Sequence, residues 1–443
     1  MANTSTAPVR LSDQAVLQLR TLDPAGPLDD LAWLDEVIGA ARVVAIGESA
    51  HYNREFFQLR HRLLRYLAER HGFSAFAMES GFVEGWQPDR WVRGGDGELG
   101  EVMANGMTSL MGLWTQLRDL LAWMRQHNRT AARPVGFYGI DLPGSMVSLL
   151  PGLDAVTGYL ALADPEFAID PGIGETAAAF AATSAFSAPA AMAAYGSLAP
   201  GDRDALTAGL ADLTARLLAR RLDYLRRTTA DTYERALRSL AVTVSLDALA
   251  RQMVLGHQHE MMLSRDAAIA DTVEWILRRE GRIVLAAHNG HVQRSPGTMP
   301  GLPPLTSAGM HLADRLGQDY LVIGTTTAAG QTLNTAPDFY TGRLFTDMAE
   351  APQPGSLDAL MASSHDGPFA TDLRRLPPAD AAAVRAVSQQ RFGTYYADLS
   401  PLDAYDVIVH IPQVTPADPD RAALACAPAD VRDAFARWQP ERR

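Results

Sequence analysis

Short apolar runs alternate with helical patterns along much of this chain. An apolar run of about four to eight residues, bounded by glycine and followed by helical spacing, is typical of a buried parallel strand. Such runs predict strands at residues 42–46, 74–78, 135–140, 283–287, 320–325 and 406–411. The pattern therefore predicts an α/β fold, with a central and largely parallel sheet flanked by helices.

Helices are predicted beside and between these strands. Apolar residues recur at helical spacing over residues 11–22, 31–41, 53–71, 113–124 and 266–279. The third of these helices should begin near Asn53, a residue type that favours a helix N-terminus. It should end before Gly72, because glycine favours the position that follows a helix.

The alternation of strands and helices stops between Pro143 and about Ala250. Alanine-rich segments interrupted by glycine and proline give way to a long amphipathic pattern over residues 202–251. This stretch predicts a helical insertion, about residues 143–255, that lies over the carboxyl edge of the sheet. Because no internal repeat or long disordered tract is visible, we expect residues 1–443 to form one domain carrying an inserted helical lobe.

The composition narrows the classes of function. The 443 residues, 47% of them hydrophobic and 20% charged, are typical of a soluble globular protein. A net charge of -12 argues against nucleic acid and acidic membrane surfaces as partners, because both require clustered positive charge. All 39 basic residues are arginine, so chemistry that needs a Schiff-base or phosphate-loop lysine is excluded.

Redox and targeting signals are few. The single cysteine, Cys426, excludes an internal disulfide and a multi-cysteine metal site, and we expect it to be a structural residue. Neither a signal-peptide pattern nor an apolar run of about 18 residues is visible, so we expect a cytoplasmic protein.

Carboxylates and imidazoles follow three of the predicted strands. The segments are Gly47–His51, Ala77–Ser80 and Ala287–His291. Ligands of open α/β sheets bind outside the carboxyl ends of the strands. We therefore expect Glu48, His51, Glu79, His288 and His291 to share one site, although more than 200 residues separate the first from the last. Such a set is suited to general acid–base chemistry.

The same residues allow other interpretations. Three histidines and two glutamates could bind zinc, although no HExxH pattern is present. The segment 47–51 resembles the start of a nucleophile elbow with Ser49 as nucleophile, but His51 stands where that turn needs a small residue. Glu48 could instead cap the following helix, which would leave His51 as a loop residue. His257 and His259 are expected at a solvated helix start.

Arginines supply candidate groups for anion binding. Arg54, Arg60 and Arg62 lie in the helix that follows the first strand, and Arg265 precedes the helix before strand 283–287. One or two of them could stabilise an oxyanion or hold a substrate carbonyl. For Arg62 we expect a surface salt bridge instead. Asp141 ends the third strand at the same edge and could orient a histidine or a substrate hydroxyl.

These motifs together resemble those of the erythromycin esterase family. The matching segments are Gly47–His51, Arg54–Phe56, Glu79–Phe82 and Ala287–Val292. The similarity spans most of the chain and includes the Arg265–Asp266 pair and the strand at 406–411.

The resemblance implies a metal-independent hydrolase, without a cofactor, that opens macrolide lactones. His51 would act as general base on water, and Glu48 and Glu79 would orient the base or the water. His288, His291 and Arg60 would complete the catalytic site. The residues expected to contact the substrate are Tyr52, Arg54, Asp141 and Arg265.

Two positions depart from the family pattern. Ser49-Ala50 stands where many members have Ala-Thr or Pro-Thr, and Tyr52 replaces the usual glycine after the histidine. Tyr52 would narrow or reshape the mouth of the site. The family also includes proteins of succinoglycan biosynthesis and of natural-product gene clusters, so the scaffold alone does not fix the substrate.

Three functional hypotheses follow. The first is hydrolysis of an ester or lactone in a bulky, small-molecule natural product. The second keeps the site but assigns it acyl transfer, elimination or dehydration on a biosynthetic intermediate. The third is a non-catalytic protein that binds a glycan or a polyketide.

Overall fold

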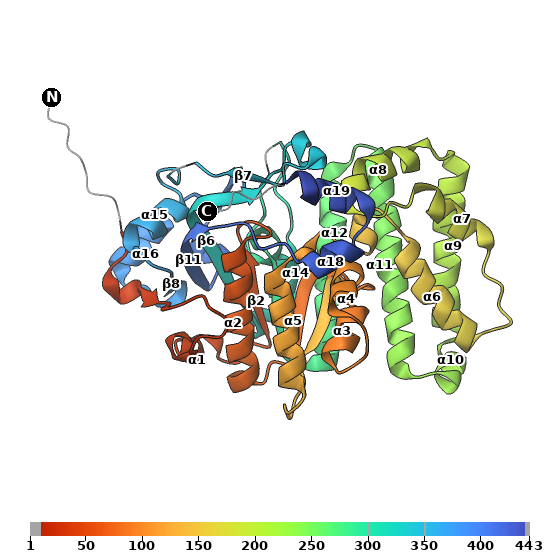
Figure 1. Ribbon diagram of the computed structural model, residues 1–443, viewed down its shortest axis with the longest axis horizontal. Coiled ribbons are helices and arrows are strands. Elements are labelled where there is room, and N and C mark those ends of the chain that lie inside the picture. The colour runs from red at the N-terminus through yellow and green to blue at the C-terminus, as the bar shows by residue number, and fades with distance from the viewer. Residues whose placement is uncertain (1–9, 300, 350, 439–443) are drawn as a thin grey trace.

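A nine-stranded mixed sheet forms the centre of the α/β part of the molecule (Figure 1). The computed structural model describes residues 10–299, 301–349 and 351–438. The strands of the sheet are β1 (Leu17–Gln18), β2 (Val43–Glu48), β3 (Ala75–Gly81), β4 (Gly136–Asp141), β5 (Ile283–His288), β6 (Tyr320–Leu333), β7 (Phe345–Asp347), β8 (Phe369–Asp372) and β11 (Val407–Val414). A separate hairpin consists of β9 (Gln389–Phe392) and β10 (Tyr395–Asp398).

The strand order is β1-β8-β11-β6-β2-β5-β3-β4, with β7 paired to β6. All pairs among β11, β6, β2, β5, β3 and β4 are parallel. The short strands β1, β7 and β8 pair antiparallel. The expected α/β fold with a largely parallel sheet is therefore confirmed.

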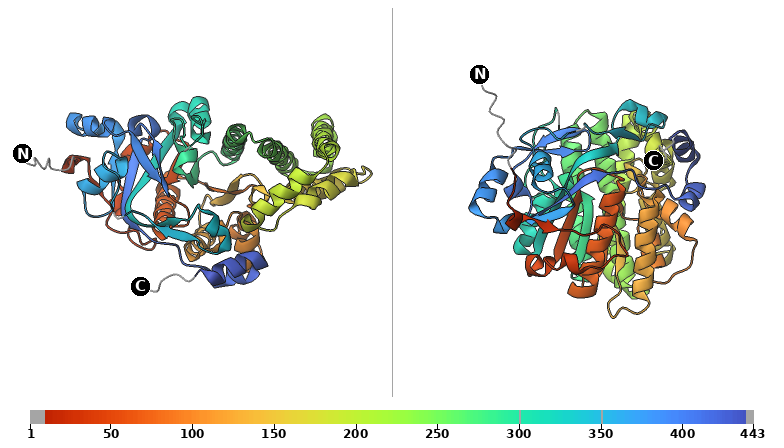
Figure 2. Two further views of the ribbon diagram at one scale, coloured as in Figure 1. Left: turned by 90° about the horizontal axis from the view of Figure 1, so that it is seen from above. Right: turned by 60° about the vertical axis from the view of Figure 1, so that its left-hand side comes forward.

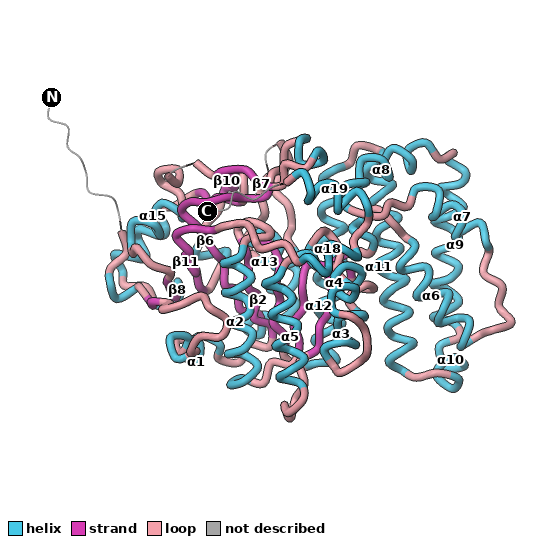
Figure 3. Tube along the Cα trace, viewed as in Figure 1, coloured by secondary structure: helices cyan, strands magenta, loops and turns pink. Residues whose placement is uncertain are grey.

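Helices cover both faces of the sheet (Figures 1 and 3). They are α1 (Leu34–Ile38), α2 (Arg54–His71), α3 (Trp86–Val92), α4 (Leu99–Gly106), α5 (Thr115–Asn128), α12 (Gln258–Glu280), α13 (Asn289–Val292), α14 (Ala308–Leu316), α15 (Leu357–Ser364), α16 (Pro378–Arg385), α17 (Pro401–Ala404), α18 (Arg421–Cys426) and α19 (Ala429–Arg437). Successive strand residues point to opposite faces, so Val43 and Ala45 join one core while Val44 and Ile46 join the other. Burial on both faces explains why these strands read as continuous apolar runs.

A helical lobe occupies the middle of the chain. Its helices are α6 (Leu150–Ala163), α7 (Pro171–Phe180), α8 (Ala188–Ser197), α9 (Pro200–Ala219), α10 (Arg221–Arg227) and α11 (Ala230–Val254). The lobe packs through α11 on α12 and lies to one side of the sheet, as two directions of view agree (Figures 1 and 2). Among the described residues, no single helix is long and apolar enough to cross a membrane, and one bent pair, at 171–180 and 185–197, meets that test by length and composition only.

Three local predictions are wrong. Residues 11–22 form a single 3-10 turn and strand β1 instead of a helix, because Leu17 and Gln18 pair with β8. Arg62 is fully buried and not at the surface. It donates to the backbone carbonyls of Thr21 and Pro27 and pairs with Asp30 at 2.7 Å. Cys426, expected to be structural, is exposed.

The buried Arg62 generates a prediction about stability. Replacement by alanine leaves the Asp30 carboxylate without its buried partner, so Arg62→Ala should lower the free energy of unfolding by about 3–5 kcal/mol. Urea denaturation followed by circular dichroism measures the change. The matched control is Arg375→Ala, which breaks a 2.6 Å pair with Glu36 at the surface and should cost about 0–1 kcal/mol. Equal losses in the two variants would contradict the prediction.

Candidate active site

Three neighbouring parallel strands bring the candidate residues together. β2 lies beside β5, and β5 lies beside β3, so their carboxyl ends meet at one edge. The register pairs Glu48 directly with His288. His51 follows in the turn that leads into α2, and Glu79 lies in β3. Strand pairing thus closes a separation of more than 200 residues along the chain.

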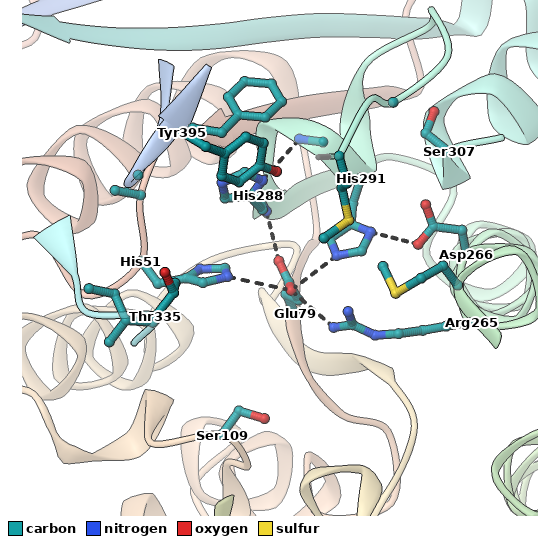
Figure 4. A pocket seen from close by; sticks show the side chains of 18 of the residues that line it. His51, Glu79, Ser109, Arg265, Asp266, His288, His291, Ser307, Thr335 and Tyr395 are labelled. Atoms are coloured by element: carbon teal, nitrogen blue, oxygen red, sulfur yellow. Dashed lines mark hydrogen bonds and ion pairs between the residues drawn. The ribbon is translucent and has the colours of Figure 1, made fainter. Parts of the chain in front are cut away.

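Glu79 lies at the centre of the cluster (Figure 4). Its Oε1 accepts a hydrogen bond from Arg265 Nη2 at 3.1 Å and lies 3.4 Å from His291 Nε2 and 3.9 Å from His51 Nε2. Its Oε2 accepts the backbone N–H of His288 at 2.7 Å. Burial alone would raise the pKa of Glu79, but the charges of His291, His51 and Arg265 hold that pKa well below the usual value. Glu79 is therefore a carboxylate.

Glu48 and Arg60 form a buried pair behind His51. Arg60 Nη1 donates to Glu48 Oε2 at 2.6 Å. Arg60 Nη2 also donates to the carbonyls of Ile46 and Ala287, at 3.1 and 2.5 Å. The guanidinium thus ties the ends of β2 and β5 to the carboxylate that contacts His51. A buried charge with this many partners is fixed in position.

His51 is oriented by Glu48. Its Nδ1 lies 2.7 Å from Glu48 Oε1, which leaves Nε2 on the side of Glu79. Burial disfavours the charged ring, but the carboxylates of Glu79 and Glu48 outweigh it and raise the pKa of His51 above 6.5. The arrangement resembles the histidine and orienting carboxylate of a hydrolase triad.

The other two histidines, His288 and His291, differ in their protonation states. His288 Nδ1 accepts the Gly290 N–H at 3.1 Å, so the neutral ring carries its proton on Nε2. Burial and the nearby charge of His51 lower the pKa of His288 to about 3. His291 Nδ1 lies 2.6 Å from Asp266. Although burial opposes it, the Asp266 and Glu79 carboxylates raise the pKa of His291 to about 10.

The raised pKa of His291 links its ion pair to stability. The folded-state value lies above the ordinary value of 6.5, so the pair stabilises the fold fully below about pH 6.5. This contribution is lost as the pH rises through about 10. His291 is therefore an imidazolium at neutral pH and supplies positive charge to the site.

Arg265 adds a second fixed positive charge. Its Nε and Nη2 donate to the two oxygens of Asp141 at 3.0 and 2.6 Å, in a bidentate arrangement. The same Nη2 contacts Glu79. Burial opposes the charge, but Asp141 and Glu79 raise the pKa of Arg265, so the guanidinium stays charged.

The cluster lies in the wall of a cavity of about 370 Å³. Small-molecule sites have volumes of about 300–1,000 Å³ and combine apolar walls with a few polar groups. The apolar walls here include Met111, Met146, Met262, Met299, Leu305, Phe392 and Tyr395. The volume and this lining fit an organic ligand with an apolar body.

Most of the residues proposed from the sequence reach this cavity. Those that line it are His51, Tyr52, Glu79, Asp141, Arg265, His288 and His291. Glu48 and Arg60 are not in the cavity wall and act on it through His51. Arg54 is not brought to the cavity, because it points to Asp418 and pairs with it at 2.6 Å.

Other residues considered from the sequence also lie outside the cavity wall. Ser49 is buried and does not line the cavity, which gives a ligand no access to its hydroxyl. His257 and His259 lie at the start of α12 and are also absent from the wall. The helical lobe, expected over the carboxyl edge, lies beside it. No residue of α6 to α11 lines the cavity, whereas Met146 before the lobe and Met262, Arg265 and Asp266 of α12 after it do.

Two parts of the site were not predicted. Asp266 fixes His291, and its other oxygen accepts the Ala308 N–H at 3.1 Å. The β9–β10 hairpin supplies residues 392–395 to the wall. The sequence did offer a sign of the role of Asp266, because this residue directly follows the candidate Arg265. In the structure, Arg265 contacts Asp141 and Glu79 while Asp266 contacts His291. The short hairpin strands carry no comparable signal.

The erythromycin esterase family model matches residues 68–414. The chain belongs to the erythromycin esterase family. Erythromycin esterase type II of Escherichia coli is 30% identical over 349 residues, which cover 76% of this chain and 81% of the relative. Erythromycin esterase type I of Escherichia coli is 27% identical over 311 residues, with 68% and 73% covered. Erythromycin esterases are carboxylic ester hydrolases, so the expected enzyme class is confirmed for the family.

Solved structures share the fold. A Bacillus cereus protein superposes with a TM-score of 0.77 at 21% identity, over 92% of this chain and 97% of its own. A succinoglycan biosynthesis protein gives 0.73 at 22% identity, over 91% and 96%. A mutant of the erythromycin esterase EreC in its open conformation gives 0.74 at 22% identity, over 89% and 97%. At these identities the likeness establishes the fold alone.

The link between Asp266 and His291 generates a prediction. Asp266→Asn removes the largest charge that keeps the His291 ring protonated, so the pKa of His291 should fall from about 10 towards 6.5. NMR titration of the ring measures it. Asp271→Asn, on the same helix but paired with Arg315 at the surface, should leave the titration unchanged. An unchanged pKa in Asp266→Asn would show that Asp266 does not set the charge of His291.

Proposed function

We propose that this member of the family hydrolyses an ester or lactone bond in a bulky natural product, with macrolide-like lactones as the first candidates. The observation that carries the proposal is His51, held by Glu48 at 2.7 Å with its Nε2 towards Glu79 in the cavity wall. The names of the Escherichia coli relatives support the macrolide class. We expect the reaction to take place in the cytoplasm.

His51 is the proposed general base. A ring that donates Nδ1–H to Glu48 has its lone pair on Nε2, which faces the cavity. A water bound between Nε2 and the Glu79 carboxylate would be within reach of both. His51 takes a proton from this water while the water oxygen attacks the carbonyl carbon. The proton is then delivered to the departing alkoxide, so the C–O bond breaks to give a carboxylic acid and an alcohol.

The tetrahedral oxyanion formed by this attack requires positive charge. The protonated His291 and Arg265 lie on the opposite side of Glu79 from His51 (Figure 4). Such fixed charges stabilise an oxyanion without reorganisation during the reaction. The neutral His288 ring lies 5.2 Å from the His51 ring, and we assign it the role of holding His51 in orientation.

We also propose that the reaction needs no metal ion. His51 Nδ1 and His291 Nδ1 are already taken by carboxylates, and Arg265 occupies the Glu79 oxygen between them. A divalent cation at that oxygen would be repelled by the guanidinium and the imidazolium. Within the residues that the structure describes, no group of three His, Cys, Asp or Glu side chains could hold a metal ion.

Replacement of His51 tests the proposed base. His51→Ala should lower kcat by about 100-fold or more, measured on erythromycin and a panel of other lactones and esters. Ser49→Ala is the control and should retain turnover, because its hydroxyl does not reach the cavity. Mass spectrometry of the product distinguishes hydrolysis, which adds one water, from elimination or acyl transfer. Wild-type turnover of no candidate would favour a binding protein, and full turnover by His51→Ala would remove His51 from the mechanism.

Metal removal tests the second part of the proposal. After exhaustive chelation and dialysis, we expect full activity in protein whose zinc content, measured by mass spectrometry, is far below one ion per chain. Loss of activity that returns on addition of zinc would contradict metal independence. His51→Ala treated in the same way controls for effects of the chelator on the assay.

A further inference from the structure

Unfavourable backbone conformations concentrate in one wall of the cavity and in the residues next to it. Among the described residues, five that are not glycine have positive φ: Tyr52 (62°), Ser109 (54°), Leu110 (65°), Ser145 (52°) and Met146 (64°). Side chains make this region unfavourable, and it persists only where surrounding contacts hold it. Tyr52, Ser109 and Met146 line the cavity. We call these five residues the Tyr52 wall.

Direct contacts join the segments of the Tyr52 wall, which are far apart in the sequence. The Tyr52 hydroxyl donates to the Ser109 carbonyl, and the Ser109 N–H donates to Ser145 Oγ at 3.0 Å. The Tyr52 ring stacks on the buried Trp114, with 5.4 Å between centroids and 27° between planes. Tyr52 therefore fixes the Ser109 segment directly and the Ser145 segment through it.

A small void adjoins the Tyr52 wall. It measures about 50 Å³, and its lining includes Ser109, Leu110 and Ser145 together with Ala427, which follows α18, and Val431 of α19. Ser109 borders both this void and the main cavity. Ser109 therefore has free space on two sides, so its position depends on the contacts that hold it.

We propose that Tyr52 is a specificity-determining positioning residue, which holds Ser109 and Ser145 forward and thereby limits the width of the substrate. The inference rests on the proposed ester hydrolysis. With Tyr52 in place, the cavity of about 370 Å³ favours the narrower and more flexible of the bulky esters and lactones. Release of the wall into the void widens the cavity towards rigid macrocyclic lactones. A change of width in an apolar pocket alters selectivity by about 10- to 200-fold.

Two substitutions separate the contributions of the tyrosine. Tyr52→Phe removes only the hydroxyl bond to Ser109, and Tyr52→Gly also removes the ring and the steric cost of the positive φ. We expect the ratio of kcat/KM for erythromycin to kcat/KM for p-nitrophenyl acetate to rise about tenfold or more in Tyr52→Gly, and less in Tyr52→Phe. The gain should come from a lower KM for erythromycin and not from a higher kcat.

The control is Tyr66→Phe, which removes a hydroxyl bond of 2.6 Å to Asp35 outside the cavity wall and should leave the ratio unchanged. An unchanged ratio in both Tyr52 variants, with wild-type turnover that still depends on His51, would overturn the role of Tyr52 and leave the proposed function intact.

Crystal structures of the variants provide a test that does not depend on turnover. In Tyr52→Phe we expect Ser109 to leave the left-handed region and the Ser109 and Ser145 segments to shift into the void. A variant structure with the same φ at Ser109 and Ser145 and the same cavity width would overturn the proposal. If the wild-type protein hydrolyses no ester, the proposed function fails. The crystal structures still decide whether Tyr52 positions the wall.

Discussion

The site depends on one buried carboxylate, that of Glu79. An unpaired charge in such a place is costly, so the surrounding elements must deliver donors to it. They come from α12 through Arg265, from the end of β5 through the His288 N–H, and from α13 through His291. A shift of β5 against β3 by one residue would remove the backbone donor. The register of the central strands therefore determines the geometry of the site.

The three histidines around Glu79 have different pKa values. Burial and the charge of His51 outweigh Glu79 and keep His288 neutral, whereas Asp266 and Glu79 keep His291 protonated. At His51, burial lowers the pKa, but the carboxylates of Glu79 and Glu48 outweigh it and raise the pKa. Separation of the pKa values of neighbouring groups is how enzymes divide acid, base and electrostatic roles among similar side chains.

The features that could be predicted from the sequence are those that depend on the local pattern of apolar and polar residues. The central strands were predicted because burial on both faces makes them compact apolar runs, and their shared edge placed Glu48, Glu79 and His288 in one site. Strands β1, β7 and β8 were not predicted, since they are two to four residues long and exist only through distant partners. The burial of Arg62 depends on the loop at 21–30, which no periodicity describes.

The position of β2 in the sheet has a consequence for biosynthesis. β2 pairs only with β5 and β6 among the described strands, yet both come from the second half of the chain. At roughly 5–20 residues per second, a ribosome needs on the order of 10–50 seconds to translate from β2 to β5. During that interval both edges of an apolar strand lack their native partners. The β2 strand and His51 therefore acquire their native surroundings only after more than half of the chain has been synthesised.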